Sequence, residues 1–458
     1  MRSVLVLNVV GLTPELLGED TPALSKLAAD GFQASLEPVL PAVTCASQAT
    51  VLTGTMPREH GVVANGWYHR ERAEVALWHQ SNHLVTGKKV WERGRERAAD
   101  FTCAKLFWWH NMYSSADWSV TPRPIYTADG RKLPSFYTSP PELKGRIEGE
   151  LGNFPLFEFW GPTAGIGSTE WIARSAALVI DEHRPTLTLV YLPHLDYDLQ
   201  RFGPHFDGIQ GALRAVDRVA GELVEHARGH DLEVVVLSEY GITEVSDSVG
   251  INRLLRRAGF LAVQETLGWE LLDAGASRAF AVSDHQVAHV YVPDNADIAA
   301  VRKLLAETDG VDFVLDRDGK ADYGLDHPRS GELVAVAAPG RWFDYYYWLD
   351  DSRAPDFART VDIHRKPGYD PVELFLDQEK LLVKLRVLAK LVKKRLGFRT
   401  LLDVIPLRPE LVRGSHGRLP AQPSEGPLLI SSSRRQERPS LHMTEVSDLI
   451  LDTVFDSA

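Results

Sequence analysis

The chain has 458 residues, of which 44% are hydrophobic and 24% charged, and its formal net charge is −12. This composition is typical of a folded globular protein and excludes an intrinsically disordered chain. The negative charge argues against general nucleic-acid binding, because a non-specific nucleic-acid surface needs clustered Lys and Arg. We therefore expect no nucleic-acid polymer as a partner, and an anionic substrate must meet a local positive site.

The two cysteines, Cys45 and Cys103, are too few for a disulfide framework and are not spaced as metal ligands. A reducing compartment, the cytoplasm, is the expected location. The apolar run at residues 4–10 is short and no small-residue cleavage site follows it, so we interpret it as a first strand. No window approaches 18 uninterrupted apolar residues, which predicts no transmembrane helix.

Short apolar runs recur along the chain, at residues 4–10, 187–192, 234–237 and 333–338. Such runs are typical of strands buried on both faces in a parallel sheet. Helical stretches with apolar residues three and four apart lie between them, at residues 168–181 and 209–228. The alternation predicts an α/β fold with a doubly wound, mostly parallel sheet flanked by helices, and an active site at the carboxyl ends of its strands.

The predicted α/β core comprises residues 1–251 and 325–458, and it ends in a strand at 427–430 and a helix at 444–454. Residues 108–137 are dense in aromatics and proline, and we interpret them as a lid insertion. A small α+β cap is predicted for residues 252–324, because they contain a strand candidate at 287–292 and a helix candidate at 296–307.

The segment 380–399 reverses the sign of the chain's charge, with eight Lys or Arg and no acidic residue. Apolar residues stand between these cations in a helical rhythm, so peripheral contact with an anionic membrane is one interpretation. The alternative is a long helix whose basic face is solvated.

A distinctive stretch begins at residues 41–44, which read Pro-Ala-Val-Thr, and it continues through Thr53-Gly54, His60-Gly61 and Asn65-Gly66. Thr44 stands where a helix should begin. A hydroxyl there lies in a field that favours an alkoxide and an incoming phosphate. The structural alternative is that Thr44 only caps the helix.

Taken together, these elements resemble the nucleophile region of the nucleotide pyrophosphatase/phosphodiesterase (type I phosphodiesterase) family of the alkaline phosphatase superfamily. The resemblance implies an alkaline phosphatase-like fold in which Thr44 accepts a phosphoryl group and Asn65 hydrogen-bonds the transferring phosphoryl oxygens. It also implies two zinc ions, which neutralise charge on those oxygens. His60 is interpreted as a residue that holds the loop and not as a ligand.

The first metal site that the resemblance implies is mostly retained. Asp196 follows a predicted strand, and Gln200 stands four residues later, where the family has a metal-binding His. His416 lies in an intact Gly-Ser-His-Gly motif. We expect Asp196 and His416 to be metal ligands, with the neutral amide of Gln200 as a weaker donor.

The second implied site has lost more of its ligands. Val10 stands where the family has an Asp, and a valine cannot coordinate a metal. Glu239 keeps a carboxylate, whereas Tyr240 replaces a His. We therefore predict a degenerate site with one divalent ion, zinc if any, or none. Two polar clusters, at residues 284–289 and 362–370, are alternative sources of ligands or phosphate contacts.

Three functions are compatible with these observations. The leading hypothesis is a hydrolase of phosphate diesters, pyrophosphates or phosphonates that acts on a phosphorylated small molecule through Thr44. The second is a catalytically silent member of the fold that binds a phosphorylated or lipid-linked metabolite, or a partner in a biosynthetic pathway. The third is a phosphomutase or other transferase. The sequence does not identify the substrate, the oligomeric state or the pathway.

Overall fold

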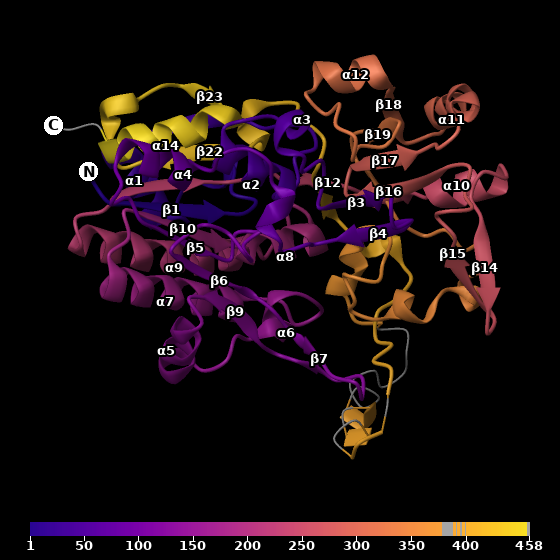
Figure 1. The fold of residues 1–458 in the computed structure, drawn as a ribbon, viewed down its shortest axis with the longest axis horizontal. Helices are drawn as coiled ribbons and strands as arrows, with labels where there is room; N and C mark the ends of the chain where they lie inside the picture. Colours follow the sequence, from indigo (N-terminus) through magenta and orange to yellow (C-terminus); the bar gives the residue numbers. More distant parts are fainter. Residues whose placement is uncertain (378–387, 391, 394–395, 399, 456–458) are drawn as a thin grey trace.

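The computed structural model describes residues 1–377, 388–390, 392–393, 396–398 and 400–455. Within these residues, the centre of the molecule is a nine-stranded sheet with the order β23-β2-β22-β11-β1-β10-β5-β6-β9 (Figure 1). Its strands are β1 (Val4–Val9), β2 (Phe32–Glu37), β5 (Cys103–Leu106), β6 (Trp118–Pro122), β9 (Phe136–Ser139), β10 (Leu187–Leu192), β11 (Glu233–Leu237), β22 (Leu428–Ser431) and β23 (Ser440–His442).

The sheet is mostly parallel. Strand β1 pairs in parallel with both β10 and β11, and β5 continues the parallel set from β10 to β6. Strands β22 and β9 run antiparallel to their neighbours β11 and β6. Every residue of β1 and β10 is buried, which explains why these strands read as continuous apolar runs. The predicted fold class is confirmed.

Helices cover both faces of this sheet (Figure 1). On one face α7 packs on β5 and β10, and α9 packs on β1 and β11. On the other face α14 contacts β1, α2 and α4. The helices on the first face are α1 (Pro22–Asp30), α5 (Glu142–Leu151), α7 (Ile166–His183), α8 (His194–Phe202) and α9 (Ile209–Gly229). Those on the second are α2 (Thr44–Thr53), α4 (Val90–Arg97) and α14 (Val446–Phe455).

A second sheet with its own hydrophobic core lies beside the carboxyl ends of the central strands (Figure 1). Its order is β16-β17-β19-β18, and all its pairings are antiparallel. The strands are β16 (Phe280–Asp284), β17 (Val287–Tyr291), β18 (Val311–Leu315) and β19 (Leu333–Ala337), accompanied by α10 (Ile251–Arg257), α11 (Asn295–Ala306) and α12 (Arg317–Asp322). Hairpins β3 (Gly66–His69)–β4 (Glu74–Leu77) and β14 (Val263–Thr266)–β15 (Trp269–Leu272) flank it.

The assignment of residues 333–338 to the parallel sheet is wrong, because β19 is the strand between β17 and β18 of the antiparallel sheet. All five residues of β19 are buried. A strand covered on both faces reads as an apolar run in either kind of sheet, so the pattern alone does not choose between them.

Residues 108–137 contribute to the central sheet through β6 and the beginning of β9. The short hairpin of β7 (Ile125–Tyr126) and β8 (Lys132–Leu133) extends beyond the sheet (Figure 1). The range 252–324 lies in the second part of the molecule, together with β19 and the β3–β4 hairpin. The domain boundaries stay a prediction.

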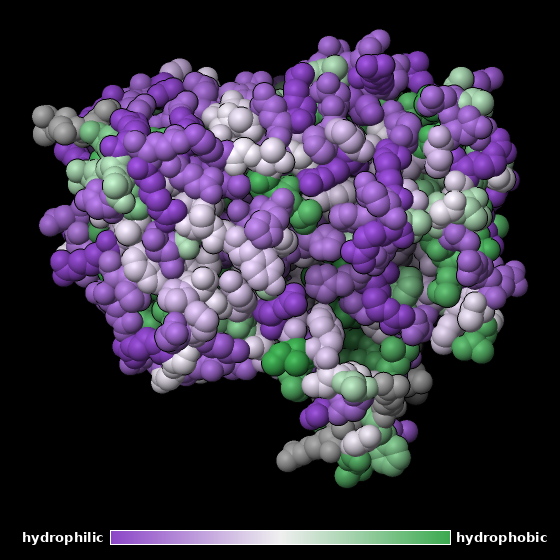
Figure 2. Space-filling model, in the orientation of Figure 1, coloured by the Kyte–Doolittle hydropathy of each residue, from purple (hydrophilic) through white to green (hydrophobic). Residues whose placement is uncertain are grey.

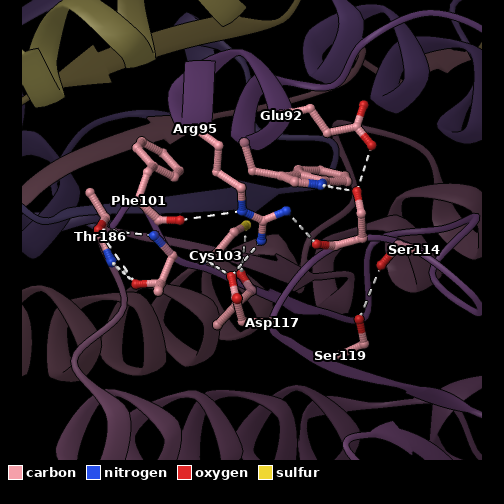
Figure 3. Close-up of polar contacts among 12 residues, drawn as sticks. Glu92, Arg95, Phe101, Cys103, Ser114, Asp117, Ser119 and Thr186 are labelled. Carbon is pink, nitrogen blue, oxygen red and sulfur yellow. Dashed lines mark hydrogen bonds and ion pairs between the residues drawn. The ribbon is translucent and has the colours of Figure 1, made fainter. Parts of the chain in front are cut away.

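A polar network joins α4 to the amino-terminal ends of β5 and β6 (Figure 3). The Arg95 guanidinium donates to Asp117 Oδ2 over 2.7 Å and to the Phe101 carbonyl oxygen over 3.3 Å. The same Asp117 oxygen accepts the backbone N–H of Cys103 at 2.7 Å. These bonds tie the helix to the strands at the edge of the sheet opposite the carboxyl ends.

Among the described residues, no helix is long and apolar enough to cross a membrane. The segment 380–399, for which membrane contact was one interpretation, lies largely outside the described residues. Its described members include exposed Leu388, Leu396 and Phe398. Figure 2 shows hydrophobic residues on the part of the molecule that projects at the bottom of the view, whereas the rest of this face is mostly hydrophilic.

Candidate functional site

Thr44 is the first residue of α2 and is only 3% exposed. Val43 occupies the N-cap position, and its side chain makes no capping hydrogen bond. The interpretation of Thr44 as an N-cap is therefore wrong. Its hydroxyl instead forms a hydrogen bond with the Tyr240 hydroxyl, at 3.1 Å between the oxygens.

Tyr240 connects Thr44 to Asp196. The tyrosine lies three residues after β11, and Asp196 lies in the first turn of α8, directly after β10. Tyr240 donates its hydroxyl proton to Asp196 Oδ1 over 3.2 Å. Since that proton is committed to the carboxylate, Thr44 is the donor in its own bond with Tyr240. The result is a directed chain from Thr44 through Tyr240 to Asp196.

Gln200 holds the other oxygen of Asp196. Its amide nitrogen donates to Asp196 Oδ2 over 2.8 Å, and its amide oxygen accepts the Tyr369 hydroxyl at 2.8 Å. Burial raises the pKa of Asp196 to about 6, and the bonds from Gln200 and Tyr240 oppose that rise. Asp196 therefore carries its charge at neutral pH and loses it in mild acid.

Glu239, next to Tyr240, is bound by amides and not by cations. Its Oε1 accepts from Asn8 Nδ2 at 2.5 Å and from Gln48 Nε2 at 2.6 Å. Burial raises the pKa of Glu239 to about 8, an effect that these two amide bonds only reduce. At pH 7 the folded protein thus keeps most of this carboxyl protonated.

His416 follows β21 (Gly414–Ser415), a short strand paired with β12 (Thr243–Glu244). Its Nδ1 bonds the Ala42 carbonyl oxygen at 2.8 Å, so Nδ1 carries the proton. The Nε2 atom is buried and has no hydrogen-bond partner among the described residues. Burial lowers the pKa of His416 to about 3, which keeps the imidazole neutral.

The glycines of the Gly-Ser-His-Gly motif have separate physical roles. A Cβ on Gly414 would lie 2.0 Å from the Leu199 carbonyl oxygen, so only glycine lets this strand approach the end of α8. Gly417 has φ +118°, a conformation that L side chains rarely adopt. The motif therefore brings His416 against the helix that carries Asp196.

Four aromatic rings form a stack beside the hydrogen-bonded chain. The Tyr240 and His416 ring centroids are 3.5 Å apart, His416 and His285 are 3.6 Å apart, and His285 and Tyr369 are 3.8 Å apart. Because Tyr369 also bonds Gln200, the stack and the hydrogen bonds close into one circuit through Asp196. Its ring members come from sequence positions as distant as 240 and 416.

Asn65 connects α2 to the second part of the molecule. Its Oδ1 accepts the backbone N–H of Cys45 at 2.9 Å, while its Nδ2 donates to Asp284 Oδ1 over 3.0 Å. Asp284 also accepts the Asn65 backbone N–H at 2.8 Å, and burial raises its pKa to about 6. His60 bonds Thr50 and the Val62 N–H, which agrees with a loop-holding role.

The side chains as they stand do not fit a two-zinc site. Val10 is a fully buried core residue, both Asp196 oxygens accept hydrogen bonds, and Tyr240 occupies the face of His416. Within the described part of the chain, the group of three His, Cys, Asp or Glu side chains close enough to share an ion is not at this site; it consists of Asp181, His226 and His230. Among the described residues at this site, the buried atoms without a hydrogen-bond partner that could still ligate an ion include His416 Nε2, Glu239 Oε2 and His285 Nδ1.

The structure thus brings together Thr44, Asp196, Gln200, Glu239 and His416, and it places Asn65 one hydrogen bond from the residue after Thr44. Of the alternative clusters, 284–289 supplies Asp284 and His285, whereas 362–370 supplies Tyr369. His289 lies apart, where it bonds the Val63 carbonyl oxygen.

Sequence reasoning missed Asn8 and Gln48, which bind Glu239, and it gave Tyr369 no individual role. Asn8 is the one polar residue in the apolar run of β1, and a buried amide in such a strand is a signal that it has a polar partner. Gln48 carries no comparable signal, because glutamine is common in helices.

A family model described as type I phosphodiesterase / nucleotide pyrophosphatase matches residues 4–370. A pyrophosphatase/phosphodiesterase of Schizosaccharomyces pombe, described as uncharacterized, is 27% identical over 55% of this chain and 46% of its own length. Human ectonucleotide pyrophosphatase/phosphodiesterase family member 7 is 24% identical over 59% of this chain and 54% of its own length. The chain spans about half the length of these curated relatives.

Solved structures confirm the alkaline phosphatase-like fold. Phosphonoacetate hydrolase from Sinorhizobium meliloti, in complex with phosphonoformate, superposes with a TM-score of 0.63 at 14% identity, over 99% of this chain and 96% of that one. An inactive form of murine ectonucleotide pyrophosphatase/phosphodiesterase 5, in complex with AMP, gives 0.57 at 14% identity, over 100% and 96%. At such identities the likeness concerns the fold alone.

Proposed function

The chain belongs to the type I phosphodiesterase / nucleotide pyrophosphatase family, and on that premise we propose that it hydrolyses phosphate diesters, pyrophosphates or phosphonates of small molecules, with Thr44 as the nucleophile. The observation that carries the proposal is the hydrogen bond from the Thr44 hydroxyl to Tyr240, which itself donates to Asp196. A hydroxyl that only capped α2 would not be oriented in this way.

In the proposed first step, Thr44 Oγ1 forms a bond to phosphorus while the bond from phosphorus to the leaving group breaks. Tyr240 takes the Thr44 proton and passes its own proton to Asp196 Oδ1, so Asp196 acts as the base at a distance of two hydrogen bonds. The leaving group departs with the electron pair of its bond to phosphorus and takes a proton from solvent. A water oxygen then bonds to phosphorus while the bond from phosphorus to Thr44 Oγ1 breaks, and the proton held by Asp196 returns through Tyr240 to restore the Thr44 hydroxyl while the proton of the water is released to solvent.

Asn65 is proposed to stabilise the phosphoryl oxygens. A side-chain amide has two N–H donors, and one of them is committed to Asp284. The other is the donor proposed for the charge that develops on the phosphoryl group. The amino-terminal end of α2 adds a favourable field for the same anionic group.

The proposed metal complement is one divalent ion or none, whereas the family is divalent-metal dependent. Asp196 and His416 are the proposed ligands, with Glu239 and Gln200 beside them. This rests on the loss of a carboxylate at Val10 and on the neutral state of Glu239 at pH 7. When bound, such an ion would neutralise charge on the phosphoryl oxygens.

A second candidate function is a catalytically silent protein that binds a phosphorylated or lipid-linked metabolite. The specific observation in its favour is that the polar groups at the family's metal positions satisfy one another. Asp196, Gln200 and Tyr240 form hydrogen bonds among themselves where the resemblance implies metal coordination. A retained fold with this internally bonded site would still present the helix end that attracts phosphate.

The substrate class and location are part of the proposal. The structural neighbours in complex with AMP and phosphonoformate support a phosphorylated or phosphonate small molecule. Cys45 and Cys103 are both buried free thiols, which supports a cytoplasmic location, because reducing conditions keep cysteines in this form.

The test is a turnover assay with bis(p-nitrophenyl) phosphate and a p-nitrophenyl phosphonate ester, with zinc, manganese or magnesium added and with none. Thr44→Ala should abolish turnover, while the exposed control Thr86→Ala should leave it unchanged. Turnover that is absent in the unmodified protein, or equal in Thr44→Ala, refutes the hydrolase. A shift in melting temperature with AMP, in the absence of turnover, would then favour the second candidate.

A further inference from the structure

A group of three metal-ligating side chains lies on the helices that cover the first face of the sheet, apart from the site just described. Asp181 is near the end of α7, His226 is in the last turns of α9, and His230 directly follows α9. Because α9 leads into the start of β11, this group lies at the amino-terminal edge of the parallel strands, whereas Thr44 lies at the carboxyl edge.

The three side chains converge on one point. His226 Nε2 and His230 Nε2 are each 2.9 Å from the same oxygen, Asp181 Oδ1. The three ligand atoms all lie within 4.8 Å of one another. Ligands around a tetrahedral zinc with bonds of about 2.0–2.1 Å are roughly 3.3 Å apart. The two distances from Asp181 Oδ1 would therefore lengthen by only a few tenths of an ångström around an ion, and the two imidazole nitrogens already lie within 4.8 Å of each other.

From this geometry we propose that Asp181, His226 and His230 form a divalent transition-metal site, with zinc as the preferred ion. His226 and His230 are four residues apart at the end of α9, so both imidazoles can reach a single ion, and a carboxylate from the neighbouring helix α7 completes a three-ligand set. Imidazole nitrogen favours zinc, copper and nickel, whereas magnesium and calcium prefer sites built from oxygen.

The surroundings of the cluster suit an ion that enters from solvent. The side chains of Asp181, His226 and His230 are 51%, 28% and 24% exposed. Helices α7 and α9 pack against each other and on the sheet, so the three ligands stand on a rigid scaffold. Three protein ligands leave a fourth coordination position for water, and the ion would link the ends of two helices.

The experiment measures zinc per chain after chelator treatment and dialysis against dilute zinc, by elemental analysis. The unmodified protein should hold one zinc ion more per chain than His226→Gln/His230→Gln. The affinity of the Asp181 cluster for zinc should fall more than about tenfold in this double variant. A matched control, His83→Gln/His205→Gln, removes two exposed histidines outside the cluster and should keep that ion. Equal zinc content in the unmodified protein and the cluster variant overturns the proposal.

Two further measurements keep the test decisive if the double variant folds poorly. Asp181→Asn, a nearly isosteric change at a half-exposed position, should also lose the ion, and zinc should raise the melting temperature of the unmodified protein but not of this variant. His416→Gln should retain the ion, which separates this site from the one beside Thr44. A melting temperature that rises equally with zinc in Asp181→Asn would also contradict the proposal.

Discussion

Replacing Tyr240 by phenylalanine removes one oxygen atom and isolates the hydrogen-bonded chain that the proposed mechanism uses. The phenyl ring keeps its place beside His416, because only the hydroxyl is deleted. Two hydrogen bonds are lost, one from Thr44 at 3.1 Å and one to Asp196 at 3.2 Å. Asp196 is only 7% exposed, so water does not readily replace the missing donor.

The cost to stability depends on the charge of Asp196. A hydrogen bond to a charged group contributes about 1.5–3 kcal/mol and a neutral one about 0.5–1.5 kcal/mol, so Tyr240→Phe should lose roughly 2–4.5 kcal/mol at pH 8. Burial raises the pKa of Asp196 to about 6, and at pH 5 its carboxyl is mostly protonated. The loss at pH 5 should then fall to about 1–3 kcal/mol, because both lost bonds are then neutral.

The effect on turnover follows from the role of Tyr240 in proton transfer. General-base assistance contributes about 10²–10⁴-fold, so kcat with the chromogenic diester should fall by that factor in Tyr240→Phe. Thr44→Ala/Tyr240→Phe should lose little more than Thr44→Ala alone, since the residues act as a unit. Urea unfolding at both pH values and initial rates provide the two measurements.

Tyr346→Phe is the matched control. Tyr346 is a buried tyrosine whose hydroxyl has no hydrogen-bond partner in the described part of the chain. Its replacement should change neither kcat nor the pH dependence of stability. If Tyr240→Phe behaves like this control while Thr44→Ala abolishes turnover, Tyr240 does not carry the Thr44 proton and the relay is wrong.

Three further predictions concern the same site. Burial raises the pKa of Glu239 to about 8 from an ordinary value of 4.5. The folded state therefore holds this proton more tightly than the unfolded chain. The contribution of the proton to stability is lost as the pH rises from about 4.5 to 8. At about 1.36 kcal/mol per pH unit, that loss is at most about 4.8 kcal/mol. Urea unfolding at pH 5 and pH 8 should show that Glu239→Gln removes most of this pH dependence. An unchanged difference in unfolding free energy between the two pH values would contradict the raised pKa of Glu239. Zinc should bind tightly to the triple variant Val10→Asp/Gln200→His/Tyr240→His, as measured by elemental analysis. Val10→Asp alone should only destabilise the core. An unchanged zinc content in the triple variant would show that more than these ligands is missing. Gly414→Ala places a Cβ 2.0 Å from the Leu199 carbonyl oxygen, so calorimetry should show a loss of about 1–3 kcal/mol together with reduced turnover, and Gly211→Ala, where a Cβ meets nothing within 4 Å, should show neither.

The sequence by itself determined the fold class and the family. Continuous apolar runs at β1, β10 and β11 indicate parallel strands because such strands are buried on both faces. The periodic apolar stripes of α7 and α9 indicate the covering helices. These are local patterns, and each can be read within one element. The substitutions at Val10, Gln200 and Tyr240 were also visible, because each stands at a family motif position.

Only the tertiary structure decided what those substituted residues do. The role of Tyr240 depends on Thr44 and Asp196. The role of Gln200 depends on Tyr369, which lies 169 residues later in the sequence. No local pattern encodes such a pairing, because it arises where the carboxyl ends of several strands meet a loop of the second part of the molecule. For the same reason the Glu239 partners Asn8 and Gln48 came from the structure, and residues 333–337 proved to belong to the antiparallel sheet. Burial and partner identity are properties of the packed chain, and they decide whether a carboxyl is a charged ligand or a neutral hydrogen-bonding group.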